Sequence, residues 1–232
     1  MGVSDAEKPQ KRSLKPGTML YPLPAVIISC GNAERSNMLT VAWTSTVSTN
    51  PPMVAVSVRP ERYSYPMILE NMELTVNTTT AAMARATDWV GVRSGRDQDK
   101  WAATGLTPVP GRKVSCPYVG ESPLVLECKV RRVMPLGSHH MMLAEVVNVL
   151  ADEALFDPQT DTLELERAGL MSYNHGHYYA QGRELGRFGF SVMKKSTAKR
   201  IAAGKKSAKA GAGTNGGASA KSRRKTNKKG TI

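Results

Sequence analysis

The sequence predicts a mostly β protein with a few short helices, folded as a closed or nearly closed antiparallel barrel. Three observations support this fold class. Short runs rich in β-branched and aromatic residues recur along the chain, and such residues favour a pleated sheet. Only two segments have the composition and end signals of helices. The 232 residues, 41% of them hydrophobic, are enough for one good-sized core or two small ones.

The first strands lie between residues 25 and 52. AVIISCG (25–31) is a short apolar run, and NMLTVAWTSTVSTNPP (37–52) reads as one longer strand. Side chains alternate across a strand. One face would therefore carry Leu39, Val41, Trp43, Ser45 and Val47, and the other only the small Thr40, Ala42, Thr44, Thr46 and Ser48. Two prolines at 51 and 52 donate no backbone N–H and mark an edge or an abrupt exit.

The small-residue face has two interpretations. Threonine is favourable on exposed strands, so this face can simply be solvated. Alternatively, a flat ligand lies against it, because small side chains let a planar ring approach the backbone while hydroxyls hydrogen-bond a polyol or a phosphate.

The remaining elements follow in order. MVAVSV (53–58) places three valines on one face, and ELTVNT (73–78) is a further strand. TAAMARATDWVG (80–91) predicts a helix capped by Thr79 or Thr80 and ended by Gly91. SGRDQDKWAATG (94–105) predicts a second helix, because Ser94 and Asp97 have the spacing of a capping box. Residues 124–152 predict two long strands joined by a turn at 135–138.

Charge divides the chain into three parts. From Lys194 onward there are 13 Lys or Arg and no acidic residue, whereas the preceding 193 residues hold 19 basic and 19 acidic residues. We therefore expect a flexible lead-in at 1–17, one domain at 18–193, and a disordered basic tail at 194–232. The tail fits a nucleic-acid contact, a nuclear address or a solubilising segment.

Several classes of protein are disfavoured. No apolar run is long enough to span a membrane, and the N-terminus has no apolar signal region. Three cysteines without a CxxC motif argue against a disulfide framework and favour a reducing compartment, the cytoplasm. The histidines form two pairs, 139–140 and 175–177, without carboxylate or cysteine at a clear ligand spacing, so we expect no metal site.

Several segments together resemble the flavin reductase-like family, with the flavoredoxin-type proteins as the nearest subgroup. They are PLPAVIISCGN, NMLTVAWTSTVSTNPPMVAVSVRPERYSYPMI, LTVN, GVRSGRDQDKW, ESPLVLECKV, LGSHHMMLAEV and YNHGHYYAQGRELGRFGFSV, in this order over about residues 20–192. The resemblance implies an FMN-binding split barrel, usually a homodimer, whose non-covalent FMN exchanges hydride or electrons. It implies that the flavin lies along Asn37, Thr40, Ala42, Trp43, Thr44 and Ser45.

Several basic and hydroxyl side chains are candidates for binding an anionic group of a ligand. By the resemblance, the turn with Arg62 and Ser64 lies near the ribityl phosphate, and guanidinium groups match phosphate geometry. The expected helix start at Ser94, with Lys100 nearby, suits either this phosphate or the pyrophosphate of a nicotinamide nucleotide. A solvated basic turn and an ordinary capped helix are the alternatives.

Two histidines are the candidate catalytic residues. His140 and His175 would hydrogen-bond the flavin edge or orient a nicotinamide, with Tyr173, Tyr178 and Tyr179 walling the pocket. The alternative is one buried and one exposed histidine in each pair.

The function expected from these residues is an FMN-dependent oxidoreductase with NAD(P)H as co-substrate and a small-molecule or protein electron acceptor. The alternative is an electron-transfer flavoprotein that a protein partner reduces. A third hypothesis is nucleic-acid binding through the tail, but it assigns no function to the barrel.

Overall fold

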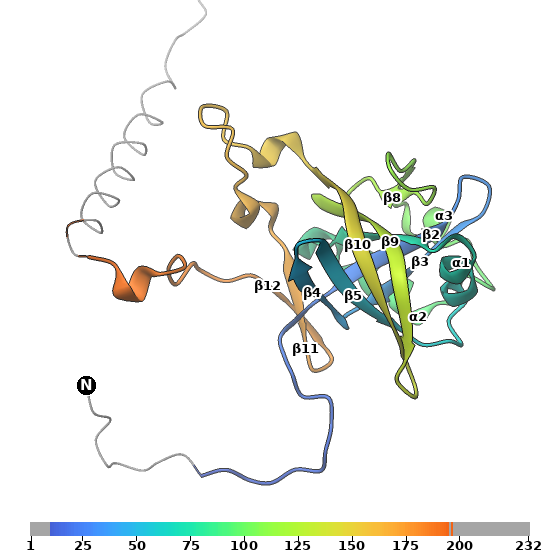
Figure 1. Cartoon of the computed structure of the whole chain (residues 1–232), viewed down its shortest axis with the longest axis horizontal. Coiled ribbons are helices and arrows are strands. Elements are labelled where there is room, and N and C mark those ends of the chain that lie inside the picture. The colour runs from blue at the N-terminus through green and yellow to red at the C-terminus, as the bar shows by residue number, and fades with distance from the viewer. Residues whose placement is uncertain (1–9, 195, 197–232) are drawn as a thin grey trace, which may run out of the picture. The chain divides into compact units, whose positions relative to one another are not determined.

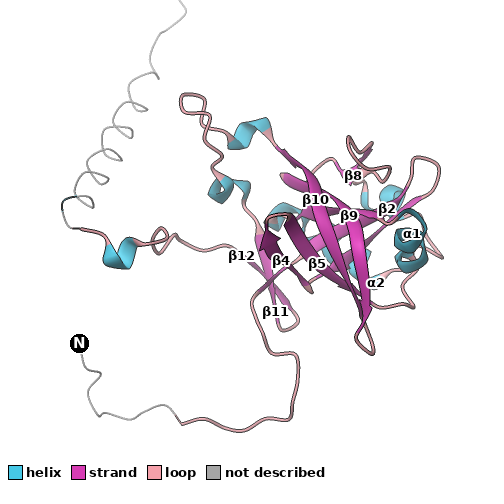
Figure 2. Ribbon diagram, viewed as in Figure 1, coloured by secondary structure: helices cyan, strands magenta, loops and turns pink. Residues whose placement is uncertain are grey.

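A seven-stranded antiparallel sheet forms the body of the molecule in the computed structural model, which describes residues 10–194 and 196 (Figure 1). In spatial order its strands are β3 (Ser36–Val41), β2 (Val26–Gly31), β6 (Glu73–Thr78), β9 (Leu124–Pro135), β10 (His140–Ala151), β5 (Pro52–Val58) and β4 (Thr44–Thr49). Figure 2 shows that strands dominate this body and that its helices are short. The predicted mostly β fold class is confirmed.

The sheet is a barrel with a split between its two end strands. β3 and β4 stand at opposite ends of the sheet order, yet only Ala42 and Trp43 connect them. The sheet must therefore curl until its ends meet. No ladder joins β3 to β4 within the described residues, and the Trp43 carbonyl instead accepts a hydrogen bond from the Ser57 amide, at 2.9 Å.

The prediction of one strand over 37–52 is wrong, because the chain turns at the split. The Thr44 amide donates to the Ala42 carbonyl at 3.0 Å, and this local bond interrupts the extended backbone. The alternation of faces is reset there. Thr44 is buried, whereas Trp43 and Val47 are exposed. β4 lies at one end of the sheet, in agreement with the edge that the two prolines predicted.

The core has two parts, and β2 separates them. Inside the barrel, Ile28 of β2 packs with the three valines that share one face of β5, which are all nearly inaccessible. On the other side of β2, Ile27 packs against Met38, Val90 and other residues beneath the helices. Because β2 is buried on both faces, it reads as a continuous apolar run rather than an alternating one.

Three helices lie around the barrel. α1 (Ser64–Asn71) was not predicted from the sequence, whereas α2 (Ala84–Val92) was, and a 3-10 turn (Ala81–Met83) precedes it. α3 (Lys100–Thr104) ends at Gly105 as predicted but does not begin at Ser94. Its cap is Asp99, whose side chain accepts from the amides of Trp101 and Ala102 at 2.9 and 3.2 Å.

Small elements complete the described chain. A second sheet has the order β1 (Leu23–Pro24), β11 (Met171–Asn174), β12 (His177–Ala180), and β7 (Pro108–Val109) pairs with β8 (Tyr118–Val119). Further 3-10 helices span Glu153–Leu155, Leu165–Ala168 and Phe190–Val192. Contacts divide the chain after Gly182, whereas the sequence put the domain end at 193. Apart from residues 194 and 196, the expected basic tail lies outside the described residues, as do 1–9 of the lead-in.

Candidate functional site

Two adjoining hollows open at the split of the barrel. The first, here called the split hollow, has a volume of about 370 Å³ and is lined by the ends of β3 and β5 and by the β9–β10 turn. The second, here called the basic hollow, has a volume of about 340 Å³ and lies toward α1 and the loop before α3. Leu39, Arg59, Arg62 and Val92 line both, so one elongated ligand can occupy them together.

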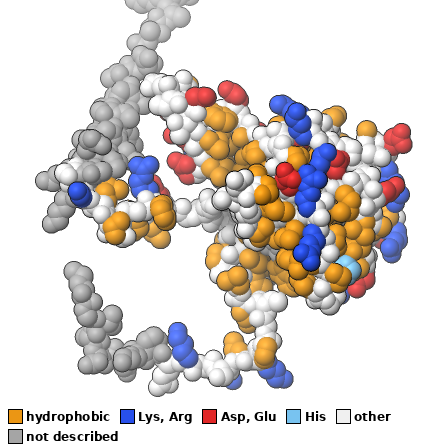
Figure 3. All heavy atoms as spheres, in the orientation of Figure 1, with side chains coloured by type: hydrophobic (Ala, Val, Ile, Leu, Met, Phe, Trp, Pro, Cys, Tyr) orange, Lys and Arg blue, Asp and Glu red, His pale blue; other side chains and the backbone are white. Residues whose placement is uncertain are grey.

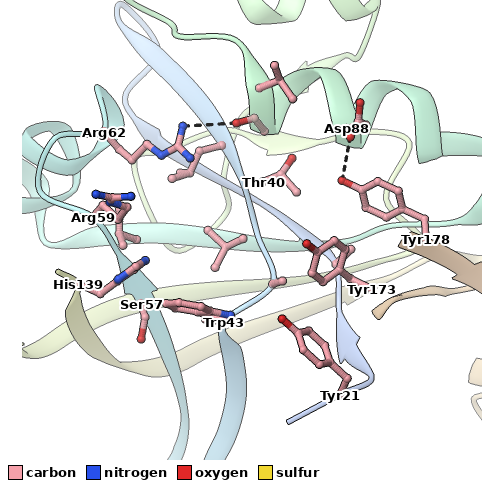
Figure 4. Close-up of a pocket in the computed structure, with 17 residues that line it drawn as sticks. Tyr21, Thr40, Trp43, Ser57, Arg59, Arg62, Asp88, His139, Tyr173 and Tyr178 are labelled. Atoms are coloured by element: carbon pink, nitrogen blue, oxygen red, sulfur yellow. Dashed lines mark hydrogen bonds between the residues drawn. The ribbon is translucent and has the colours of Figure 1, made fainter. Parts of the chain in front are cut away.

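The end of β3 and the residue after it form one wall of the split hollow (Figure 4). Thr40, Val41 and Ala42 line it, and the chain leaves the wall at Trp43. The Thr40 hydroxyl donates to the Thr87 carbonyl of α2. α2 can approach this closely because Gly91 has no side chain: a Cβ there would lie 3.1 Å from the Thr40 Cβ. The wall is therefore flat and held against a helix.

Trp43 and His139 stand together at this hollow. Their ring centroids are 4.4 Å apart and the planes are tilted by 45°. His139 belongs to the β9–β10 turn and is half-buried. Burial first, and then the positive charge of Arg59, lowers the pKa of His139. The histidine is thus biased toward its neutral form, in which one ring nitrogen accepts and the other donates.

Positive charge concentrates in the basic hollow. Arg59, Arg62, Arg93 and Lys100 line it, against one acidic residue, Glu61, which pairs with Arg59 at 3.5 Å. Arg62 also donates to the Gly91 carbonyl at 3.4 Å, so its guanidinium stands between the two hollows (Figure 4).

Lys100 is a buried cation without a carboxylate partner. Its side chain is 4% exposed, and its ammonium donates to the carbonyls of Met38 and Val90 at 2.8 and 2.7 Å. None of the ion pairs in the described part of the chain includes it. Burial, and secondly the Arg62 charge, lowers its pKa to about 8. Since an ammonium has three protons, one remains for a ligand in the hollow.

Two neutral groups face the same hollow. Ser64 is the first residue of α1, and its hydroxyl accepts from the Asn37 side-chain amide at 2.7 Å. Gly95 packs so closely on Asn37 that a Cβ there would overlap the amide. The Ser64 hydroxyl retains its own proton for a ligand, and the cations that line the hollow favour an anionic one.

Most predicted site residues lie at these hollows. Thr40, Ala42, Trp43 and Arg62 line the split hollow, and Asn37, Arg62, Ser64, Ser94 and Lys100 line the basic hollow. Ser94 is there as a loop residue, because its hydroxyl accepts from the Arg96 amide in a tight turn and does not cap a helix. The predicted helix N-terminus at Ser94 is therefore corrected to a loop.

Four predicted residues line neither hollow: Thr44, Ser45, His140 and His175. The reset at Ala42 and Trp43 turns Thr44 inward, where its hydroxyl donates to the Ala55 carbonyl at 2.8 Å. His140 is engaged by its Nδ1 with the Tyr65 hydroxyl at 2.6 Å. His175 lies in the β11–β12 turn, with its ring against Tyr21.

The structure adds residues that the sequence reasoning did not select. His139 lines the split hollow in place of its neighbour, and Arg59 stands beside Arg62. Each lies within three residues of a residue that the sequence analysis did select, His140 and Arg62 respectively. Tyr173 and Tyr178 wall the hollow as predicted, whereas Tyr179 does not line it, and Tyr21 and Asp88 join from distant parts of the sequence. Only the fold could reveal the last two.

Residues 10–194 and 196 contain no group of three or more His, Cys, Asp or Glu side chains arranged to hold a metal ion. None of the helices found there is both long and apolar enough to cross a bilayer.

Comparison with known proteins gives consistent matches. The family model described as flavin reductase like domain matches residues 18–182. Flavoredoxin of Desulfovibrio vulgaris (Miyazaki F) superposes with a TM-score of 0.73 at 30% identity, covering 79% of this chain and 100% of that one. An uncharacterized protein of Archaeoglobus fulgidus is 30% identical over 61% of this chain and 80% of its own length. An FMN reductase (NADH), RutF, of Escherichia coli O6:K15:H31 is 26% identical over 52% of this chain and 71% of its own.

Proposed function

Because the chain belongs to the flavin reductase-like family, we propose that it is an FMN-binding oxidoreductase that takes hydride from NAD(P)H and passes the electrons to a second acceptor. The observation that carries the proposal is the pair of adjoining hollows, one with a flat wall of small residues and one with a buried, uncompensated lysine. FMN has the same two parts, a flat ring and a dianionic phosphate.

The basic hollow suits the phosphate. A phosphate monoester carries close to two negative charges at neutral pH and offers three acceptor oxygens. Lys100 and Arg62 would supply charge-assisted hydrogen bonds, and Ser64 and Ser94 would supply hydroxyl donors. Asn37 would hold Ser64 in place through the bond between their side chains.

The split hollow suits the ring. Thr40 and Ala42 leave the β3 wall flat enough for a planar ring to approach the backbone, and Trp43 closes one end. When bound, FMN supplies the hydride chemistry, which these side chains lack. The chain's own residues would bind, orient and shield the ring. His139, biased toward the neutral form, would hydrogen-bond the ring edge and hold a proton there.

A bulky residue at Ala42 tests the site. We expect Ala42→Leu to weaken FMN binding at least about tenfold, because it displaces the ring from the wall, while the protein stays folded since Ala42 is only half-buried. FMN fluorescence quenching measures this. Ala103→Leu, on the exposed side of α3, is the matched control. A protein that takes up no FMN, or an Ala42→Leu variant that holds FMN as tightly as the parent, contradicts the proposal.

A second candidate function is electron transfer without nicotinamide activity, and the similarity to a flavoredoxin favours it. The two candidates differ in one measurement. Steady-state oxidation of NADH and of NADPH, with FMN in excess, gives a rate proportional to enzyme if the first is correct. A rate equal to the background with both nucleotides favours the second and implies a protein that delivers the electrons.

We also propose that the chain forms a homodimer through the outer face of β4 and β5. The face seen in Figure 3 carries apolar side chains among polar ones, and Val47 of β4 is 49% exposed. Residues Met19 and Leu20 add apolar surface to a hollow shared with Trp43 and Met141. Light scattering should give twice the chain mass, and Val47→Lys should reduce it toward one chain, whereas Leu69→Lys on α1 should not. A monomeric parent protein would contradict this proposal.

The cysteines support a cytoplasmic location. Cys30, Cys116 and Cys128 are all free and buried. Burial raises the pKa of Cys30 and Cys128 to about 12, so neither is poised as a reactive thiolate. Such thiols persist in a reducing compartment.

A further inference from the structure

Three tyrosines form a continuous wall on one side of the split hollow. Tyr173 lies on β11 and Tyr178 on β12 of the small sheet, and Tyr21 lies in the segment just before β1 (Figure 4). The ring centroids of Tyr21 and Tyr173 are 6.0 Å apart, and those of Tyr173 and Tyr178 are 5.6 Å apart. Sequence positions separated by most of the domain thus present one aromatic surface to the hollow.

A carboxylate stands at the end of this wall. The Tyr178 hydroxyl donates to Oδ1 of Asp88, on α2, at 3.2 Å. Burial and then the Asp88 charge raise the pKa of Tyr178 to about 12, so the phenol remains a donor. Asp88 is the one acidic residue that lines this hollow, and no ion pair within the described residues includes it. Its other oxygen is left for a ligand.

The charges around the hollow are sorted to opposite sides. Arg59 and Arg62 lie across the hollow from Asp88 and Tyr178 in Figure 4, and His139 lies beside Arg59. The basic side serves an anionic cofactor. The Asp88 carboxylate repels a phosphate, so this side of the hollow suits a different ligand.

We infer that Tyr21, Tyr173, Tyr178 and Asp88 form a subsite for the molecule that exchanges electrons with the flavin. We infer that this subsite takes a planar aromatic ring that is neutral or positively charged. This inference rests on the proposed FMN site, which the subsite faces. Aromatic faces attract cations because of their quadrupole, and a carboxylate at the rim adds to the attraction. An anionic ring of the same size meets the Asp88 charge and is disfavoured.

Two probe molecules of nearly equal size test the charge preference. The FMN-loaded protein is titrated with 1-methylnicotinamide, a cation, and with nicotinate, an anion, and the visible spectrum of the bound flavin reports binding. We expect the cation to bind at least about tenfold more tightly, from cation–π attraction and the carboxylate together. Equal binding, or tighter binding of the anion, overturns the inference.

Variants test which residues cause the preference for the cationic probe. Asp88→Asn should reduce the ratio of the two affinities to less than about threefold, because it removes one charge and little volume. Tyr173→Leu should weaken binding of both probes, since it opens the aromatic wall. The matched control is Asp161→Asn, an exposed residue at a positive φ of 52°, which asparagine tolerates. An unchanged ratio in Asp88→Asn overturns the assignment.

The outcomes separate this subsite from the proposed cofactor. If the protein binds FMN but shows no charge preference, only the subsite is wrong. If the protein binds no FMN, the proposed function is wrong. The inferred subsite is then wrong too, because its ligand was inferred to face a bound flavin.

Discussion

Lys100 is a side chain whose position suits a bound ligand and lowers the stability of the protein without that ligand. Its ammonium is buried, satisfied by two backbone carbonyls, and faced by Arg62 rather than by a carboxylate. A fold optimised only for stability would not bury this charge, since desolvation is costly without a counter-ion. A bound phosphate dianion would supply the missing negative charge.

The lowered pKa of Lys100 predicts how FMN binding depends on pH. The free protein loses this positive charge as the pH rises through about 8. Binding of a phosphate dianion then requires uptake of a proton, so FMN affinity should be nearly constant between about pH 7 and 8 and fall above that, by up to about tenfold per pH unit. Flavin fluorescence titrations across this range measure the effect. A flat profile in the parent protein would refute the role of Lys100.

The variant Lys100→Met tests this role, because it removes the titrating ammonium and keeps a side chain of similar length. It should bind FMN about ten- to a hundredfold more weakly at neutral pH, because a charge-assisted hydrogen bond is lost, and its affinity should vary little with pH near 8. Stability of the free parent protein should show the opposite trend. The unfolded chain binds more protons between pH 8 and the ordinary lysine value of 10.5, so stability from this group rises with pH there.

At the scale of elements, the position of α3 decides where Lys100 stands. The helix is only five residues long, and Asp99 caps it immediately before Lys100. Ser94 and Asp97 have the spacing of a capping box, but the chain folds their segment into turns, with Gly95 packed on Asn37. Because a short helix gains little from its own hydrogen bonds, the cap and the packing determine its start.

Removing the observed cap should therefore matter more than removing the predicted one. Asp99→Ala should lower the free energy of unfolding by about 1 kcal/mol, since the amides of Trp101 and Ala102 lose their acceptor. Ser94→Ala should cost less than about 0.5 kcal/mol, because Ser94 accepts only within an exposed turn. Urea unfolding of the two variants beside the parent measures both. A larger effect at Ser94 would contradict the assignment of the cap.

At the scale of the whole molecule, charge is unevenly distributed along the chain. Residues 1–193 are formally neutral, and the entire net charge of +13 comes from the segment after them. A polycationic segment binds nucleic acid chiefly by releasing counterions, and such binding weakens steeply with salt. The family model ends at 182, so the proposed FMN site does not depend on that segment.

Truncation separates the two parts. A chain ending at 193 should bind FMN within twofold of the full chain and should lose any affinity for double-stranded DNA. For the full chain, DNA affinity should fall by at least about tenfold between 50 and 200 mM salt, as fluorescence anisotropy would measure. DNA binding that survives the truncation would assign the nucleic-acid contact to the barrel instead.

The sequence by itself determined the mostly β fold class and several of the long strands, and it selected residues that the structure places around the two hollows. Strand periodicity identified β5, β9 and β10, and the order of motifs carried the resemblance to the family. Residues such as Ala42, Arg62 and Lys100 were found because residue type and nearby sequence suffice to suggest a flat wall or an anion site.

Only the tertiary structure decided the rest. The split at Ala42 and Trp43 turned Thr44 away from the hollow, because closing the barrel bends the chain where periodicity predicts it to continue. His139 rather than His140 lines the hollow, because His139 lies in the β9–β10 turn, whereas His140 begins β10 and its ring is bound to the Tyr65 hydroxyl. Tyr21, Asp88 and Tyr178 meet across long sequence separations. Local patterns cannot encode such meetings, because sheet closure and the pairing of β1 with β11 create them.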